Sequence, residues 1–331
     1  MQNRASLPAG IAVTVPARLH LGFLDLNGGL GRRFGSIGLA IGDLGTSIAI
    51  RRTERTKLSG PESDRARHYL ESMERLLALA GAHELNVLQA VPAHAGLGSG
   101  TQLALAVAAG VRRLHNLPLD VEGDAMHLGR GTRSGIGIGL FSRGGLVVDG
   151  GRGNELRPAP VVSHLPFPDR WRVLVILDPK LRGVHGADEV KTFAALQPMS
   201  DAEAAHICRL ILMRALPALA EHDLVGFGAA IKELQARIGD YFAPAQGGAR
   251  FTSRDVADVV NALDRAGAFG VGQSSWGPTG FAFAPSAEEA TRLAASVQRN
   301  ASARGLDIRI CKGLNHGAEI VAPAYAHESG Q

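Results

Sequence analysis

Cysteine and aromatic residues are scarce in this sequence, and long apolar runs are absent from it. Its 331 residues include only 2 cysteines, and aromatic residues make up 5% of the chain. Cys208 and Cys311 stand far apart and match no metal-ligand spacing, so we expect no disulfide framework and a reducing compartment, the cytoplasm. No run of about eighteen apolar residues and no apolar leader occurs, so we expect neither a membrane partner nor a signal peptide.

Lysine is also rare, which leaves the positive charge to arginine. Five of the 35 basic residues are lysines, and the formal net charge is +4. Arginine binds phosphates and carboxylates through a planar fork of N–H groups. GC-rich codon usage would explain the overall excess equally well, so only position can show which arginines bind an anion. No run of basic residues alternates with aromatic ones, so we expect no nucleic-acid partner.

Glycine, in contrast, is abundant. The chain has 42 glycines among 331 residues, about twice the usual share of ~7%. They follow no three-residue period, which excludes collagen, and an apolar content of 45% excludes disorder. We therefore expect the glycines to lie in specific tight loops of a globular protein that has one large or two medium domains.

Strands and helices alternate irregularly along the chain, which favours an α+β fold with a break near residues 180–200. The pattern of apolar residues predicts strands at residues 10–21, 46–52, 87–91, 145–149, 171–177, 281–283 and 307–311. It predicts helices at residues 61–81, 102–114, 121–128, 202–219, 224–237, 253–266 and 286–304. We interpret the polar helix at residues 61–81 as a solvated surface element.

The clearest local signal is the stretch Gly96-Leu97-Gly98-Ser99-Gly100-Thr101, between a predicted strand and a predicted helix. Glycines allow several backbone N–H groups to point into one concavity, and the helix N-terminus adds partial positive charge. This arrangement suits a phosphate or pyrophosphate. It is neither a P-loop nor a Rossmann fingerprint, because its spacing differs from both. The alternative is a glycine-rich cap that only allows close packing of helix and strand.

Two further glycine-rich stretches carry polar side chains. The stretch 130–135 has two arginines among glycines and hydroxyl groups, which suits an anion, although a solvated loop is the alternative. The stretch 270–280 offers an amide, two hydroxyl groups and the aromatic face of Trp276, although a turn between strands would explain it as well.

Together these stretches resemble the GHMP superfamily of small-molecule kinases. The segment 92–104 is similar to the central phosphate-binding motif of that superfamily, 16–22 to its N-terminal motif and 270–280 to its C-terminal glycine-rich motif. The resemblance implies a domain like ribosomal protein S5 over residues 1–185, a ferredoxin-like domain over residues 186–331, and an active site between them.

One position departs from the kinase pattern. Many of these kinases carry a Ser-Gly-x-Asp segment whose acid orients or deprotonates the attacking hydroxyl group, whereas here the segment is Ser134-Gly135-Ile136-Gly137. Glycine takes the place of the acid, and no carboxylate occurs between Asp124 and Asp149 to replace it. This combination favours phosphate binding without phosphoryl transfer.

Within the superfamily, the stretches 17–27, 129–145 and 272–278 resemble the β-ribofuranosylaminobenzene 5′-phosphate synthase family. The resemblance implies condensation of 5-phosphoribosyl 1-pyrophosphate with 4-aminobenzoate, or 4-hydroxybenzoate in some relatives. Pyrophosphate and CO₂ leave in this first committed step toward the methanopterin-type one-carbon carrier. Such a decarboxylating pentosyltransferase needs stabilisation of the leaving group, for which we expect arginines and a divalent metal such as Mg²⁺.

We expect Asp25, Arg32 and Arg133 to be catalytic, with Asp25 also the candidate ligand for Mg²⁺ or a ribose hydroxyl group. The other expected phosphate- and substrate-binding residues come from the same motifs: Arg18, His20, Gly96, Gly98, Ser99, Gly100, Thr101, Gln102, Arg130, Ser134, Gly135, Gln273, Ser274, Ser275 and Trp276. His20 could equally be a core histidine. Phe23 and Trp276 could stack on the aromatic substrate or simply pack.

Two other functions remain open at this point. An ATP-dependent kinase of the same superfamily would need its acid elsewhere in the site, and a non-catalytic binder would keep only the fold. We also expect a homodimer, from the superfamily and from the apolar stretch 207–219, which could equally be core.

Overall fold

The computed structural model describes residues 9–154, 157–183 and 186–322. Within these residues, the N-terminal part forms a seven-stranded sheet in which the order β11-β1-β2-β4-β3 continues from β2 to β5 and β6. Its strands are β1 (Gly10–Asp25), β2 (Phe34–Thr53), β3 (Lys57–Ser59), β4 (Ala82–Gln89), β5 (Leu146–Asp149), β6 (Val161–Leu165) and β11 (Glu319–Val321). The pairs are antiparallel except for β3 with β4.

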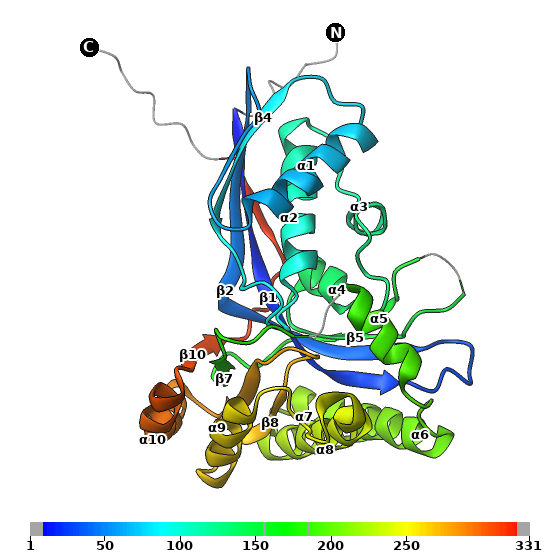
Figure 1. Cartoon of the computed structure of the whole chain (residues 1–331), viewed down its shortest axis with the longest axis vertical. Coiled ribbons are helices and arrows are strands. Elements are labelled where there is room, and N and C mark those ends of the chain that lie inside the picture. Colours follow the sequence, from blue (N-terminus) through cyan, green and yellow to red (C-terminus); the bar gives the residue numbers. More distant parts are fainter. Residues whose placement is uncertain (1–8, 155–156, 184–185, 323–331) are drawn as a thin grey trace.

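Helices pack against this sheet through small side chains. Figure 1 shows α1 (Ser63–Leu76) and α2 (Ser99–Leu114) beside it, followed by α3 (Val121–His127) and α4 (Ile136–Arg143). The alanines of α2 are buried, and Gly110 lies against Ile48 and Ile50 of β2. This close approach fixes the start of α2, at Ser99, beside the end of the sheet.

The C-terminal sheet has the ferredoxin-like order. Its strands are β7 (Arg172–Leu177), β8 (Phe269–Gln273), β9 (Gly280–Ala284) and β10 (Asp307–Lys312), arranged β10-β7-β9-β8 with all pairs antiparallel. One apolar cluster joins the sheet to α9 (Arg254–Arg265) and α10 (Ala287–Arg304). The predicted α+β class is therefore confirmed.

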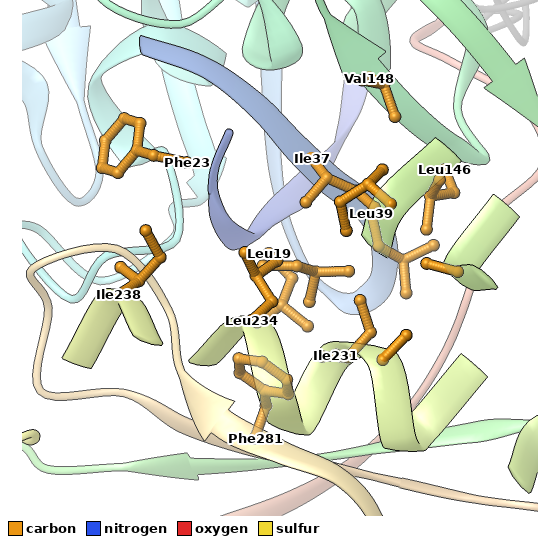
Figure 2. Close-up of a cluster of buried hydrophobic side chains, with 14 of the residues drawn as sticks. Leu19, Phe23, Ile37, Leu39, Leu146, Val148, Ile231, Leu234, Ile238 and Phe281 are labelled. Atoms are coloured by element: carbon orange, nitrogen blue, oxygen red, sulfur yellow. The ribbon is translucent and has the colours of Figure 1, made fainter. Parts of the chain in front are cut away.

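Helix α8 (Leu224–Phe242) holds the two sheets together. In Figure 2, Ile231, Leu234 and Ile238 of α8 lie among apolar side chains from both parts, including Leu19 and Phe281. Polar groups bridge the sheets as well. The Gln235 amide donates to the Leu21 carbonyl of β1 at 2.6 Å and accepts the Gln273 N–H of β8 at 2.7 Å.

Two strands do not follow the expected division of the chain between residues 185 and 186. Strand β7 precedes residue 185 and pairs with β9 and β10, whereas β11 comes last and pairs with β1. The two sheets are thus connected by the chain more than once, and the boundary itself stays a prediction.

Several segments differ from the sequence-based expectation, and strands β3, β6 and β11 were not predicted. Helix α4 and strand β8 occur where we expected glycine-rich loops. The helix expected at residues 202–219 is divided into α6 (Asp201–Leu210), a π-helical turn (Ile211–Ala215) and α7 (Leu216–Ala220), because Pro217 has no N–H to continue the regular pattern. The remaining helix, α5, spans Gly186–Ala195.

Among the described residues, no helix combines the length and the apolar character needed to cross a membrane.

Candidate active site

A cavity of about 590 Å³ lies where the three glycine-rich loops meet. Twelve of the expected site residues line it: Arg18, His20, Gly96, Gly98, Ser99, Gly100, Thr101, Arg130, Arg133, Ser134, Ser275 and Trp276. Residues from β1, from the start of α2, from the loop before α4 and from the loop after β8 are thus brought together. The volume falls in the range typical of small-molecule sites.

The N-terminus of α2 opens into this cavity. Gly96 and Gly98 have φ values of +85° and +76°, a backbone conformation that favours glycine. Gly98 is the N-cap and supplies no side-chain cap, and the first turn contains no acidic residue. The N–H groups and the partial positive charge of a 16-residue helix are therefore directed at whatever occupies the cavity.

Two guanidinium groups lie over this helix start. A Cβ atom added to Gly100 would lie 2.9 Å from Nη2 of Arg65 and 3.2 Å from Nη1 of Arg130. Arg130 donates to the Tyr69 hydroxyl group at 2.6 Å, and Arg65 donates to Glu62 at 2.8 Å. Both arginines are held by contacts at α1, which place positive charge beside the N-terminal end of α2.

The loop after β8 is hydrogen-bonded directly to the glycine-rich loop that precedes α2. The Ser274 hydroxyl group donates to the Gly96 carbonyl at 2.8 Å and accepts the backbone N–H of His20 at 3.0 Å. The Arg18 N–H donates to the Leu97 carbonyl at 3.0 Å. Gly277 lies so close to Ala95 that a Cβ there would collide with the Ala95 carbonyl. Backbone therefore packs on backbone across the loops, which accounts for the glycines.

A buried carboxylate supports the arginine-containing loop. Asp149 accepts hydrogen bonds from the Ser134 hydroxyl group at 3.0 Å, from the Gly135 N–H at 2.9 Å and from the Gly151 N–H at 2.9 Å. Burial raises the pKa of Asp149, although these hydrogen bonds act in the opposite direction. Asp149 thereby fixes the turn that carries Arg133 and Ser134 into the cavity.

Part of the cavity wall is aromatic. His20 and Trp276 are each 2% exposed and Phe23 is 4% exposed, and all three line the cavity. The His20 and Phe23 rings lie 4.6 Å apart, and Phe193 contacts both Phe23 and Trp276. Burial and the nearby charge of Arg18 lower the pKa of His20 well below its usual range, so its ring is neutral.

Gly137 lies in the first turn of α4, against the start of α2. Its carbonyl accepts a hydrogen bond from the Gln102 amide at 3.3 Å, and a Cβ there would lie 3.0 Å from Cγ2 of Thr101. None of the described residues that line the cavity carries a carboxylate. The acid that a kinase would place here is therefore absent from the described wall of the site.

Comparison with known proteins identifies the family. The GHMP kinases N terminal domain family matches residues 65–141, and the GHMP kinases C terminal family matches residues 215–303. A β-ribofuranosylphenol 5′-phosphate synthase of Archaeoglobus fulgidus is 33% identical over 330 residues, which cover 94% of this chain and 99% of the relative. The chain belongs to this synthase family. The relative of the same name from Methanocaldococcus jannaschii is 33% identical over 300 residues, covering 82% of this chain and 88% of the relative.

Solved structures agree on the fold of this synthase family member. A homoserine kinase from Cytophaga hutchinsonii superposes with a TM-score of 0.66 at 16% identity, covering 97% of this chain and 100% of that one. A mevalonate diphosphate decarboxylase from Staphylococcus aureus gives a TM-score of 0.65 at 15% identity, covering 95% of this chain and 98% of that one. At such identities the likeness supports the GHMP kinase fold and nothing finer.

Asp25 and Arg32 do not line the cavity. The Asp25 carboxylate accepts the N–H groups of Asn27 and Gly28 at 2.8 and 2.9 Å, and Arg32 donates to the carbonyls of Gly150 and Gly151 at 2.7 Å each. Both shape the segment that connects β1 and β2. Their expected catalytic roles stay predictions, and within the described residues no group of three or more His, Cys, Asp or Glu side chains could hold a metal.

Four other expected residues lie behind the cavity wall. Gln102, Gly135 and Ser274 make the hydrogen bonds described above, and none of them lines the cavity. Gln273 accepts the Thr252 N–H at 2.6 Å and donates to the Ser275 carbonyl at 3.1 Å. These contacts position the loops that bear the lining residues, and the direct substrate contacts that we expected of these four residues stay predictions.

Sequence reasoning missed Arg65 and Asp149. Arg65 belongs to a helix that we interpreted as a solvated surface, and no motif distinguishes it from Arg67, which is exposed two residues later. Asp149 is the last residue of β5, a strand of four buried residues, and this position at the end of a buried strand was the available signal.

Proposed function

We propose that the protein is a decarboxylating pentosyltransferase that joins 5-phosphoribosyl 1-pyrophosphate to a 4-substituted benzoate. The acceptor is 4-hydroxybenzoate or 4-aminobenzoate, and the products are a β-ribofuranosylbenzene 5′-phosphate, pyrophosphate and CO₂. The relatives are β-ribofuranosylphenol 5′-phosphate synthases, which supports a para-substituted ring as the acceptor. The observation that carries the proposal is a cavity that is rich in arginine, open to a helix N-terminus and bare of described carboxylates.

The reaction balances without a proton-accepting side chain. The bond between ribose C1 and the pyrophosphate oxygen breaks, and pyrophosphate leaves with that electron pair. A bond forms between C1 and the ring carbon that bears the carboxylate. The bond between that ring carbon and the carboxylate then breaks, its electron pair returns to the ring, and the carboxylate leaves as CO₂. No hydroxyl group has to be deprotonated, so the glycine at position 137 agrees with this chemistry, whereas a kinase would need an acid there.

The residues of the cavity suit the charges that develop. Negative charge grows on the leaving pyrophosphate, and preorganised N–H groups and guanidinium groups stabilise such charge best where water is excluded. The start of α2 provides N–H groups and the hydroxyl groups of Ser99 and Thr101, while Arg65 and Arg130 stand over Gly100. Arg133 reaches the cavity from the adjoining turn and would take the second phosphate or the benzoate carboxylate.

A divalent cation would enter this site with its substrate. Mg²⁺ is commonly bound by few protein groups together with phosphate oxygens and water. The Ser99 and Thr101 hydroxyl groups, at the start of α2, are oxygen ligands in the cavity that suit it. When bound, the cation would neutralise part of the charge on the leaving pyrophosphate.

The proposal includes a cytoplasmic homodimer. The π-helical turn exposes Leu212 at 63% and Met213 at 67%, whereas Ile207 and Leu219 of the same stretch are buried core residues. The exposed pair supports a contact with a second copy. Light scattering at micromolar concentration tests it, since a molar mass of one chain would contradict the homodimer.

Pyrophosphate release tests the reaction. Purified protein is supplied with 5-phosphoribosyl 1-pyrophosphate and Mg²⁺, with or without each benzoate, and pyrophosphate is followed by a coupled assay. We expect release only when both substrates are present. Consumption of ATP with a small hydroxyl compound, without dependence on benzoate, would instead establish a kinase.

A further inference from the structure

The aromatic part of the cavity wall contains buried nitrogen atoms that have no hydrogen-bond partner among the described residues. Neither ring nitrogen of His20 has a hydrogen-bond partner among the described residues, and the same holds for Nε1 of Trp276. Each side chain is 2% exposed and lines the cavity. Buried polar atoms are almost always hydrogen-bonded, and leaving one unsatisfied is costly. These atoms are therefore poised for a ligand.

His20 and Trp276 belong to the same aromatic wall. The ring centroids of His20 and Phe23 lie 4.6 Å apart, those of Phe23 and Phe193 lie 5.8 Å apart, and those of Phe193 and Trp276 lie 5.3 Å apart. Ser274 accepts the His20 N–H and lies two residues before Trp276, so one loop holds both side chains in place. An aromatic ring that entered here would find ring edges and faces on its sides and nitrogen atoms beyond them.

We propose that His20 and Trp276 recognise the para substituent of the benzoate and favour a hydroxyl group over an amino group. This inference rests on the proposed function and adds the residues that choose its acceptor. The guanidinium groups of Arg65 and Arg130 lie over the start of α2, which suits the phosphates, and that of Arg133 lies 6.0 Å from the centroid of the Phe193 ring, where it suits the carboxylate. The uncharged nitrogen atoms of His20 and Trp276 are left for the uncharged substituent.

Donor and acceptor counting gives the direction of the preference. A neutral imidazole has one N–H donor and one acceptor nitrogen, and an indole has a donor only. A phenol hydroxyl group can donate to the His20 acceptor while its oxygen accepts the Trp276 N–H. An aromatic amino group can donate to His20, but its lone pair is delocalised into the ring and accepts poorly. The indole N–H then stays unsatisfied, which is the mismatch that polar sites reject most strongly.

The ratio of kcat/KM for 4-hydroxybenzoate to that for 4-aminobenzoate tests the assignment. Trp276→Phe keeps an aromatic ring and removes the N–H, and we expect it to lower this ratio about tenfold or more. Trp171→Phe is the matched control, because Trp171 packs against Phe167 and Phe227 outside the cavity lining. A ratio in Trp276→Phe within twofold of the wild-type ratio would overturn the inference. It is the result expected if the carboxylate, and not the para substituent, lay beside His20 and Trp276.

Fluorescence separates failure of this inference from failure of the proposed function. The chain has two tryptophans, so in Trp171→Phe the emission comes from Trp276 alone. With pyrophosphate present, we expect 4-hydroxybenzoate to quench this emission saturably and unsubstituted benzoate to require at least tenfold higher concentration. Quenching by the two acids at equal concentrations, or no quenching by either acid, would refute the assignment of this subsite. Absence of turnover with every benzoate would refute the proposed function, and the titration would still decide the subsite.

Discussion

Arg65 provides a sharp test of where the phosphates bind, because it was not expected from sequence and its position is specific. The perturbation is Arg65→Gln, which removes the charge and leaves a shorter polar side chain. Nη2 of Arg65 stands 2.9 Å from the position of a Cβ on Gly100, at the open end of α2. A phosphate bound to this helix end would therefore lie within reach of the guanidinium group.

The magnitude follows from the exposure of the side chain. A hydrogen bond between charged groups contributes about 1.5–3 kcal/mol. The Arg65 side chain is 29% exposed, so solvent screening favours the lower half of that range, and 1.5–2 kcal/mol corresponds to about a tenfold to thirtyfold loss in kcat/KM. The lost ion pair with Glu62 is partly exposed and should change the free energy of unfolding by less than about 1 kcal/mol.

Steady-state kinetics with 5-phosphoribosyl 1-pyrophosphate as the varied substrate measure the effect. An increase in KM alone would assign Arg65 to the 5′-phosphate, which is bound equally before and during the reaction. Equal decreases in kcat and kcat/KM would assign it to the leaving pyrophosphate, where charge grows. Arg67→Gln, an exposed change on the same helix, is the control. Unchanged constants in Arg65→Gln would refute phosphate binding at this end of α2.

Three further predictions test the supporting structure. Gly96→Ala requires an alanine at φ +85° with its Cβ against the Ser274 carbonyl, so we expect a free energy of unfolding lower by about 2 kcal/mol or more, and lost activity. Gly81→Ala, at φ +109° in open space, is the control and should lower the free energy of unfolding by only about 1 kcal/mol in the same urea titration. Equal losses in the two variants would contradict the packing argument. Burial raises the pKa of Asp149 above its ordinary 3.8, so the folded chain retains a proton that the unfolded chain has lost, and stability falls as pH rises from 3.8 through the raised value. The difference in free energy of unfolding between wild type and Asp149→Asn should therefore favour wild type more at pH 4 than at pH 7. A difference that grows with pH would refute this prediction. Gly137→Asp places a side chain 3.0 Å from Cγ2 of Thr101, so we expect lower stability and no ATP turnover; phosphorylation of any hydroxyl compound by this variant would contradict the account.

The part of the cavity wall at the start of α2 was predictable because its signal is local. Gly96, Gly98 and Ser99 lie within one short stretch between a strand and a helix, and that context alone predicts that they line an anion site; the structure confirms that they line the cavity. The same holds for α9 and α10, whose apolar periodicity and serine caps can be seen in the sequence. Where one segment contains both the signal and its partner, the sequence was sufficient.

The remainder depends on partners that are distant in sequence. Helix α4 contains Gly137 and Gly139, which lower helix propensity, but close packing against Thr101 and Val147 requires glycine there. Asp25 and Gln273 resemble site residues by motif, yet their polar groups are used by neighbouring backbone and side chains. Arg65 enters the site only because α1 packs beside α2. Local patterns carry no information about such contacts.

The stoichiometry of CO₂ and pyrophosphate tests the central claim most directly. The protein is incubated with 5-phosphoribosyl 1-pyrophosphate and carboxyl-labelled 4-hydroxybenzoate, and labelled CO₂ and pyrophosphate are counted over the same interval. The account predicts one CO₂ for each pyrophosphate, and neither product when one substrate is omitted. Pyrophosphate release without labelled CO₂, or ATP turnover in its place, would contradict it.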